Sequence, residues 1–179
     1  MNKTFLSGRI IKRYEIPLKE IEQLNNAFDE SKNNLEDKGP KLAGRMETEL
    51  SVIDIVPRLP IMHTLRSYMN DYIMSMNHFG LIDTPVLDLS ISSMWINDMK
   101  PNEYNPPHTH HDKTGWSTVM FLKVPNLIND VKHEHKFRDG TLGFIYPRDS
   151  VNFFKPVVGH FYIFEASHMH MVFPFKTND

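Results

Sequence analysis

The chain has 179 residues, of which 40% are hydrophobic and 23% charged, and its formal net charge is −2. This length and composition are typical of one globular domain with a buried core, and the near-neutral charge provides no overall field that would attract nucleic acid or an anionic membrane. The absence of cysteine excludes a disulfide framework, a cysteine-ligated zinc site and an iron–sulfur cluster.

The N-terminal part of the sequence predicts one strand and two helices. Residues 3–16 contain a plausible strand, and Pro17 is suited to the first turn of a helix. Residues 29–45 are charged and contain Gly39-Pro40, which indicates a loop, and Gly80 is placed to end a second helix over 59–79. Apolar residues recur at helical spacing in both helices, at Leu18, Ile21, Leu24 and Phe28 in the first and at Leu59, Met62, Leu65, Met69, Ile73 and Met76 in the second.

After Pro85 the pattern changes to short apolar or alternating stretches separated by turn residues. Strands are predicted at 86–97, 116–124, 141–146, 159–166 and 171–175, with a loop or strand entry at 101–115 and a polar connection at 126–140. This order favours a mainly β fold, a double-sheet jelly roll with N-terminal helices packed on one face. We expect a single domain over 1–179, with a helical part at 1–84 and a jelly-roll core at 85–179.

Two short clusters hold five of the ten histidines, and they suggest a metal site. On an extended segment His108 and His110 point to the same side, and so do His110 and Asp112; His168 and His170 repeat the spacing far along the chain. A three-ligand face of imidazole and carboxylate holds Fe(II) and leaves positions open for a co-substrate and O₂. The remaining histidines are expected to be surface or packing residues: His63, His78, His133, His135 and His160.

Two stretches resemble a family of 2-oxoglutarate/Fe(II) oxygenases found in bacteria and their tailed phages, within the double-stranded β-helix (cupin-like) superfamily. The first runs Trp-Ile-Asn-Asp-Met-Lys-Pro-Asn-Glu-Tyr-Asn-Pro-Pro-His-Thr-His from residue 95 and continues in the strand 116–125. The second is Phe-Glu-Ala-Ser-His-Met-His-Met-Val-Phe-Pro-Phe at 164–175. The resemblance covers residues 90–179 and implies Fe(II) and 2-oxoglutarate as cofactors.

The resemblance assigns the distal ligand to His170, because Val172 and Pro174 follow it as they do in the family. His168 falls at a variable position and is expected to lie nearby. For the proximal ligands two alternatives stay open. The related sequences keep His-x-His, here His108 and His110, whereas the wider superfamily uses His-x-Asp, here His110 and Asp112. The set His110, Asp112 and His170 is slightly favoured because a carboxylate offsets the metal charge, and His108 would then lie beside the ligands.

The superfamily anchors the distal carboxylate of 2-oxoglutarate on an arginine or lysine that follows the distal histidine on a further strand. This sequence ends at Asp179 before such a strand, so three alternatives stay open: a fragment lacking its last strand, anchoring by Lys176, or an altered or lost co-substrate site. Arg148 is another candidate cation, and Tyr104 a candidate pocket residue. Trp95, Asn97 and Ser117 could also line the pocket, although packing or turn formation explains each of these three residues, and Tyr104, more simply.

The function expected from the sequence is hydroxylation by a 2-oxoglutarate/Fe(II)-dependent dioxygenase acting with O₂ on a small-molecule or peptide substrate. Two alternatives stay open: a cupin-like metalloenzyme that does not use 2-oxoglutarate, and a non-enzymatic jelly-roll structural or assembly protein. Nothing in the sequence indicates nucleic-acid binding, a membrane span or a signal peptide, so we expect a cytoplasmic protein. The sequence indicates neither the substrate nor the oligomeric state.

Overall fold

The structure, a computed structural model, describes residues 3–6, 9–82, 89–110, 114–128, 138–146 and 150–178; for residues 3–6 and Pro40 it describes the backbone alone. The strands are β1 (Lys3–Leu6), β2 (Ile10–Glu15), β3 (Glu49–Ser51), β4 (Trp95–Asn97), β5 (Asn105–His108), β6 (Trp116–Met120), β7 (Leu142–Tyr146), β8 (Ser150–Phe154), β9 (His160–Glu165) and β10 (His170–Val172). The helices are α1 (Leu18–Ser31) and α2 (Ile61–His78), with short 3₁₀ helices η1 (Lys32–Asn34), η2 (Gly39–Lys41) and η3 (Val56–Arg58).

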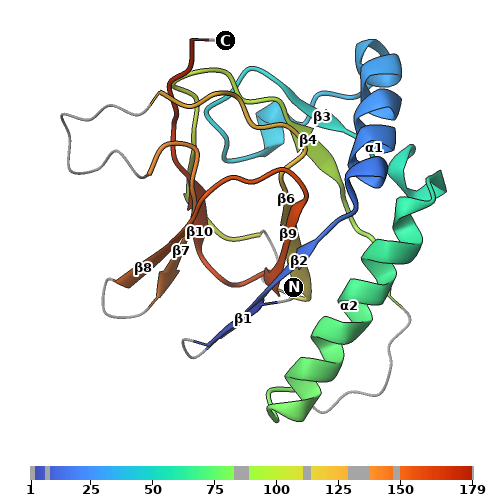
Figure 1. The fold of residues 1–179 in the computed structure, drawn as a ribbon, viewed down its shortest axis with the longest axis vertical. Coiled ribbons are helices and arrows are strands. Elements are labelled where there is room, and N and C mark those ends of the chain that lie inside the picture. Colours follow the sequence, from blue (N-terminus) through green and yellow to red (C-terminus); the bar gives the residue numbers. More distant parts are fainter. Residues whose placement is uncertain are drawn as a thin grey trace.

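The fold has three layers: the two helices, a first sheet and a second sheet. One antiparallel sheet has the strand order β1-β2-β9-β6, a second has the order β5-β10-β7-β8, and β3 and β4 form a separate two-stranded ribbon. Helices α1 and α2 lie together on one side of the sheets (Figure 1). The expectation of a mainly β jelly roll with N-terminal helices on one face is confirmed.

The first sheet is the middle layer, and its sequence shows why. Side chains alternate between the two faces of a strand, so Ile10 and Tyr14 of β2 face the helices while Ile11 faces the second sheet. In β9, Phe161 and Ile163 belong to the helix side. The core between the two sheets contains Ile11, Leu142, Phe144, Tyr146, Tyr162 and Phe164. Burial on both faces explains the continuous apolar run at residues 161–164 of β9, whereas β2 also contains Lys12, Arg13 and Glu15.

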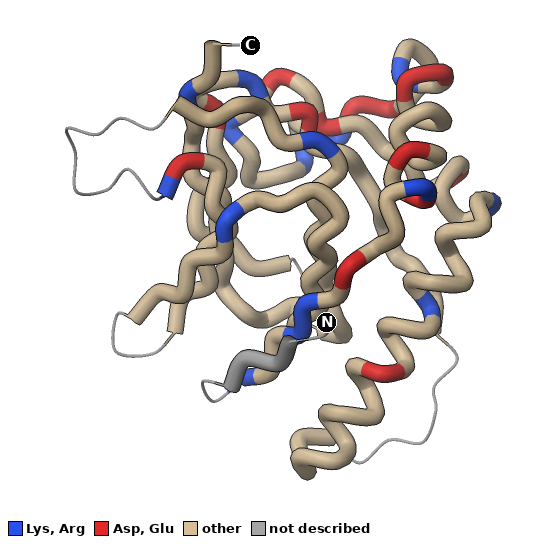
Figure 2. Tube along the Cα trace, in the orientation of Figure 1, with Lys and Arg blue, Asp and Glu red and all other residues tan. Residues whose placement is uncertain are grey.

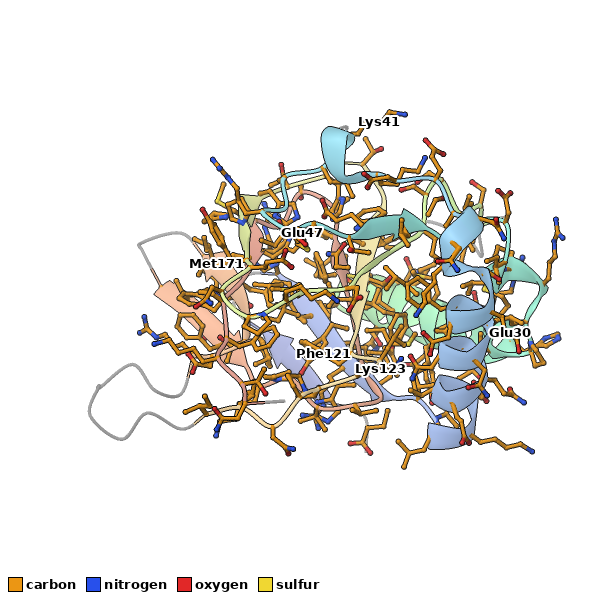
Figure 3. The ribbon with its side chains drawn as sticks, turned by 90° about the horizontal axis from the view of Figure 1, so that it is seen from above. Glu30, Lys41, Glu47, Phe121, Lys123 and Met171 are labelled. Carbon is orange, nitrogen blue, oxygen red and sulfur yellow. The ribbon has the colours of Figure 1, made fainter. Side chains whose placement is uncertain are left out.

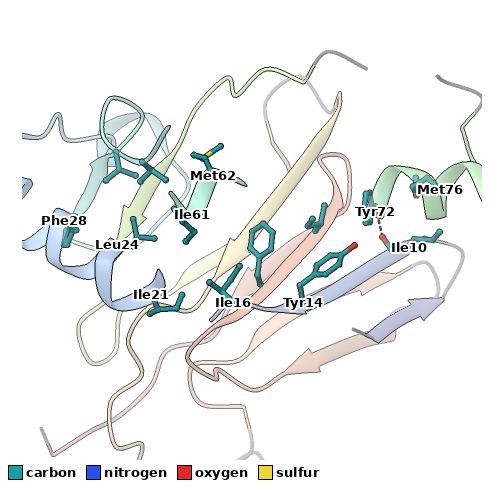
Figure 4. Packing of buried hydrophobic residues seen from close by; sticks show 14 residues of the cluster. Ile10, Tyr14, Ile16, Ile21, Leu24, Phe28, Ile61, Met62, Tyr72 and Met76 are labelled. Atoms are coloured by element: carbon teal, nitrogen blue, oxygen red, sulfur yellow. Dashed lines mark hydrogen bonds between the residues drawn. The ribbon is translucent and has the colours of Figure 1, made fainter. Parts of the chain in front are cut away.

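Helices α1 and α2 pack on the outer face of the first sheet (Figure 4). The Tyr72 hydroxyl of α2 donates a hydrogen bond to the Ile10 carbonyl at 3.0 Å. The Lys12 ammonium of β2 lies 2.5 Å from Oδ2 of Asp71 on the same helix. Gly80 adopts φ 67° just beyond the end of α2, which confirms its predicted role as the residue that stops the helix.

The strand predictions require four corrections. The single strand predicted within 3–16 is a hairpin of β1 and β2. Of the strand predicted at 86–97, only β4 forms among the described residues, because residues 89–94 pair with no strand. Strands β3 and β8 were not predicted, because these stretches are short or polar and lack apolar alternation. Strand β5 lies inside the segment predicted as a loop or strand entry at 101–115.

Residues of both charge signs are interspersed along the described chain (Figure 2). Some form surface ion pairs: the Lys123 ammonium, in the segment after β6, lies 3.1 Å from Oδ2 of Asp29 on α1. Lys123 and Glu30 are among the charged side chains labelled in Figure 3. Exposed pairs of this kind contribute little to stability. None of the helices in the described residues is long and apolar enough to cross a membrane.

Glu49 of β3 is a buried carboxylate whose two oxygens have no hydrogen-bond partner among the described residues, and its side chain is 1% exposed. Burial, together with the charges of Asp37 and Glu103, raises the pKa of the Glu49 carboxyl above its ordinary value of 4.5. The folded state therefore keeps this proton at pH values where the unfolded chain has lost it. Stability tied to Glu49 is present below pH 4.5 and is lost as the pH rises through the folded-state pKa.

The substitution Glu49→Gln should therefore leave stability unchanged at pH 4 and raise it by about 1–3 kcal/mol at pH 7, because it removes a buried unpaired charge. Urea denaturation at the two pH values measures this difference. Glu47→Gln is the matched control, because Glu47 lies two residues away but is exposed. A Glu49→Gln protein that is less stable than the wild type at pH 7 would contradict the prediction.

Candidate metal centre

The candidate site forms where β5 pairs with β10. In this antiparallel pair His108 lies directly opposite His170, and residues directly opposite each other project from the same face of the sheet. Their ring centroids are 4.3 Å apart. An irregularity in the register follows, between His170 and Val172, so that Val172 lies opposite Asn105. The strand register thus brings together two histidines that are distant in the sequence.

His110 follows the end of β5 and completes a group of three histidines. Its backbone N–H donates to the Ala166 carbonyl at 3.2 Å, which ties this segment to the end of β9. Its ring centroid lies 5.7 Å from that of His108 and 5.2 Å from that of His170. One ring nitrogen from each of the three histidines lies within 4.8 Å of the other two. A single metal ion could contact all three.

Backbone carbonyls orient two of these rings. Nδ1 of His108 lies 2.8 Å from the Pro106 carbonyl oxygen, and Nδ1 of His170 lies 2.9 Å from the His168 carbonyl oxygen. A carbonyl oxygen only accepts hydrogen bonds, so Nδ1 of each ring carries the hydrogen. The lone pair of each neutral ring is then on Nε2, the arrangement that a histidine needs to bind a metal.

His170 is the most deeply buried of the three, at 3% exposure, whereas His108 and His110 are half-buried. Burial, with a smaller contribution from His108, lowers the pKa of the His170 imidazole to about 3. The ring is therefore neutral at physiological pH and can donate its lone pair. The Phe164 ring packs 4.7 Å from that of His170, and the Phe144 ring 6.2 Å from it, so the site has an apolar wall on the core side.

Two further side chains contact His110. Nε2 of His110 lies 2.8 Å from Oγ of Ser117 on β6. The ring of Trp95 on β4 lies 5.8 Å from the His110 ring. Ser117 and Trp95, which packing could have explained from the sequence alone, thus lie beside the histidine group.

His168 lies next to the group but takes part in it only through its backbone. Its ring packs between the rings of Phe144 and Tyr146, at 5.2 Å and 4.8 Å, and neither ring nitrogen has a hydrogen-bond partner among the described residues. Burial, and the charge of Arg9, lower the pKa of the His168 imidazole to about 4. The contribution of His168 is the carbonyl that orients His170.

Among the residues that the structure describes, the group of possible metal ligands at this site consists of the three histidines alone. Asp112 and Arg148 lie outside the described residues. Tyr104 is 39% exposed and precedes His108 by four strand positions, roughly 13 Å at the usual rise per residue. Lys176 is exposed, and its carbonyl accepts a hydrogen bond from Ile128. The proposed roles of these four residues in binding metal or co-substrate stay predictions.

The remaining histidines agree with the surface or packing role expected of them where the structure describes them. His63 and His78 are exposed on α2, and His160 is half-buried beside Tyr162. His133 and His135 lie outside the described residues.

The sequence analysis missed the two carbonyl acceptors of Pro106 and His168. Each belongs to the residue two positions before the histidine that it orients. The only trace of these contacts in the sequence is local: each histidine lies in a segment predicted to be extended, two residues after the carbonyl that its ring contacts. Each bond shows only once the backbone conformation is known.

The donor set of the three histidines fits a borderline transition metal. Neutral imidazole favours Fe(II), Zn(II), Cu(II) or Ni(II) over Mg²⁺ or Ca²⁺. Three protein ligands leave coordination positions for other molecules, which is typical of a catalytic site and not of a closed structural one. The residues present therefore fit an open centre for one of these metals, Fe(II) among them.

Comparison with known proteins agrees with this geometry. Residues 93–179 match a family model described as "Putative 2OG-Fe(II) oxygenase". The structure is similar to that of a prolyl-4-hydroxylase from Pseudomonas putida, with a TM-score of 0.56 and 15% sequence identity over 93% of this chain and 86% of that chain. No curated protein matches the sequence. The segment that matches this family model, residues 93–179, contains all three histidines of the group.

Proposed function

We propose that this chain, acting as one unit over residues 1–179, is a non-haem Fe(II) and 2-oxoglutarate-dependent oxygenase that hydroxylates a small-molecule or peptide substrate. The metal would be held by His108, His110 and His170. The observation that carries the proposal is the convergence of three ring nitrogens within 4.8 Å from segments that are distant in the sequence.

Electrostatics supports three histidines as a sufficient ligand set. Three neutral imidazoles leave the double positive charge of Fe(II) uncompensated. Because His170 is buried, little water surrounds this side of the site, so the charge is weakly screened there. An uncompensated charge in such a place attracts an anion strongly. The dianion 2-oxoglutarate would neutralise the centre without a protein carboxylate. We therefore assign to His108 the ligand role that the sequence analysis gave to Asp112.

Fe(II) together with 2-oxoglutarate supplies the oxidising chemistry that transfers an oxygen atom from O₂ to a C–H bond of the substrate. The chain orients the ligands and limits access of water. The Pro106 and His168 carbonyls fix two of the imidazoles, while Phe144 and Phe164 close the core side. Lys176 and Arg148 are the candidates to bind the distal carboxylate of 2-oxoglutarate, and Tyr104 is a candidate to line its pocket.

The test uses protein purified without O₂ and loaded with Fe(II). Addition of 2-oxoglutarate should produce a weak visible chelate band, and admission of O₂ should convert the co-substrate to succinate. Both signals should be lost in His170→Ala. The visible band also separates this activity from that of a cupin-like enzyme without 2-oxoglutarate. Protein that binds neither iron nor 2-oxoglutarate would refute the proposal.

Comparison of His108→Ala with Asp112→Ala tests the ligand assignment. His108→Ala should abolish succinate formation, whereas Asp112→Ala should retain most of it. The opposite result would restore Asp112 as the third ligand.

Because the fold resembles that of a prolyl-4-hydroxylase, a proline-containing peptide belongs in the first substrate panel, beside free amino acids.

A further inference from the structure

A second candidate site lies outside the histidine group, around the buried carboxylate of Glu49. We propose that Glu49 and Asp37 bind a Ca²⁺ ion together with the side-chain oxygen of Asn97. The ion would connect the segment 37–44 to the ribbon of β3 and β4. This inference is independent of the proposed function, because it requires neither iron nor 2-oxoglutarate.

The side-chain oxygens around Glu49 meet no hydrogen-bond donor. Glu49 is 1% exposed, and neither oxygen of its carboxylate has a hydrogen-bond partner among the described residues. Asn97 lies directly opposite Glu49 in the pairing of β3 with β4, so the two side chains project from the same face of the ribbon. Oδ1 of Asn97 is also buried and has no partner in the part of the chain that the structure describes. A bound cation would satisfy all three oxygen atoms at once.

The space beside Gly39 is bordered by carboxylate oxygens. Among the described residues outside 38–40, the three heavy atoms nearest to a Cβ placed at residue 39 are Oδ1 of Asp37 at 3.2 Å, Oε2 of Glu49 at 3.5 Å and Oδ2 of Asp37 at 3.8 Å. Because residue 39 is a glycine, no side chain fills this space. Ca²⁺ binds oxygen at about 2.3–2.6 Å, so an ion between the two carboxylates could contact both.

No neighbouring lysine neutralises these two carboxylates. The ammonium groups of Lys38 and Lys41 both pair with Glu36, at 2.7 Å and 3.5 Å. Asp37 and Glu49 take part in none of the ion pairs between described residues. Together the two carboxylates carry the charge that one divalent cation compensates.

An unpaired carboxylate is costly in a buried place, and a bound cation would remove that cost. Burial, with the charges of Asp37 and Glu103, raises the pKa of the Glu49 carboxyl, so without a cation the group keeps its proton to higher pH. A divalent cation would replace this proton. The gain in stability expected above for Glu49→Gln therefore applies to protein without bound Ca²⁺.

The donor atoms favour Ca²⁺ over the metals that suit the histidine group, and also over Mg²⁺. Carboxylate and amide oxygens suit Ca²⁺ and Mg²⁺, whereas imidazoles suit iron and zinc. Mg²⁺ demands a nearly ideal octahedron and usually keeps several water molecules, whereas Ca²⁺ accepts an irregular set of oxygens. Ligands from three separate segments, at residues 37, 49 and 97, fit the more adaptable ion. Backbone carbonyls or water would complete its coordination.

Isothermal titration calorimetry of the metal-free full chain with CaCl₂ at pH 7 tests the inference. The wild type should bind one Ca²⁺ per chain, and Mg²⁺ should bind at least about 10-fold more weakly. Glu49→Gln and Asp37→Asn should each weaken Ca²⁺ binding by about 10-fold or more, because each removes a charged ligand. Glu47→Gln is the matched control and should leave the affinity unchanged, since Glu47 is exposed.

Gly39→Ala provides a variant that keeps both carboxylates but fills the space between them. Residue 39 is not among the glycines with a positive φ, so its backbone conformation is open to alanine. Ca²⁺ affinity should fall by about 10-fold or more, while the circular dichroism spectrum measured with a chelator stays that of the wild type. His170→Ala, which alters the histidine group, should keep full Ca²⁺ affinity.

A wild-type chain that binds no Ca²⁺ would overturn the inference. Full affinity in Glu49→Gln or in Gly39→Ala would also overturn it, because the ion would then bind elsewhere. Loss of Ca²⁺ binding in His170→Ala would assign the ion to the histidine group, with the same consequence. None of these results alters the test with iron and 2-oxoglutarate, so failure of this inference is distinguishable from failure of the proposed function.

Discussion

Replacement of His170 with alanine is expected to abolish tight Fe(II) binding. The loss should exceed the roughly 10-fold to 100-fold that removal of an outer hydrogen-bond partner causes, because a direct ligand is lost. His170 is the central residue of the group, directly opposite His108 in the sheet and stacked on His110. Without its ring, His108 and His110 form an incomplete ligand set. Anaerobic titration of Fe(II) against a competing chelator measures the change in affinity.

The matched control for this substitution is His63→Ala. His63 is exposed on α2 and its removal should leave Fe(II) affinity unchanged. Circular dichroism of His170→Ala establishes that the variant is folded, and His170→Gln, which keeps a polar side chain of similar size, provides a second folded variant. Fe(II) affinity within about 3-fold of the wild type, in a folded His170 variant, would show that the metal binds elsewhere.

The substitution Phe144→Ala should have the largest effect on stability. Phe144 is 0% exposed in the core between the two sheets. Its ring meets those of Phe154 at 5.7 Å, Phe164 at 4.8 Å and His168 at 5.2 Å. Truncation of a buried phenylalanine leaves a cavity and usually costs about 3–5 kcal/mol. Urea denaturation of the metal-free protein should show a loss of this size.

Phe144→Leu is the corresponding control, because leucine fills most of the volume and should cost clearly less than alanine. The same pair of variants tests whether the ring of Phe144 holds His170, a proposed metal ligand, in position. Fe(II) affinity should fall in Phe144→Ala more than in Phe144→Leu, because the ring of His170 loses packing on one side. A loss of stability below about 1 kcal/mol in Phe144→Ala would contradict the core role assigned to this ring.

The sequence predicted the elements whose apolar pattern is strong. Apolar residues at spacings of three and four located α1 and α2, and apolar runs bounded by glycine or proline located β7 and β9. The segment of β5 was predicted as a loop or strand entry and not as a definite strand, because two of the four residues of β5 are proline. Strand β8 was missed, since its exposed serine and asparagine interrupt the apolar pattern.

For the site, histidine spacing was enough to predict that two distant clusters meet, but not which residues meet. The pairing of His108 with His170 depends on the register between β5 and β10, which includes an irregularity after His170. A shift by one residue would turn a side chain to the opposite face. The preference for Asp112 over His108 was based only on the charge of the metal. The sequence does not show the register between β5 and β10, which is what places His108 opposite His170.

Among the residues that the structure describes, strand β5 forms the edge of its sheet and pairs with β10 alone. Pro106 and Pro107 lack the N–H groups that would strengthen this pairing, so the strand is held by few backbone bonds. A metal ion bound to both His108 and His170 would cross-link the edge strand β5 to its neighbour β10. In iron-depleted protein, β5 should therefore separate from β10 before the rest of the sheet unfolds. The rate of amide hydrogen exchange in these two strands should fall as the protein binds more iron.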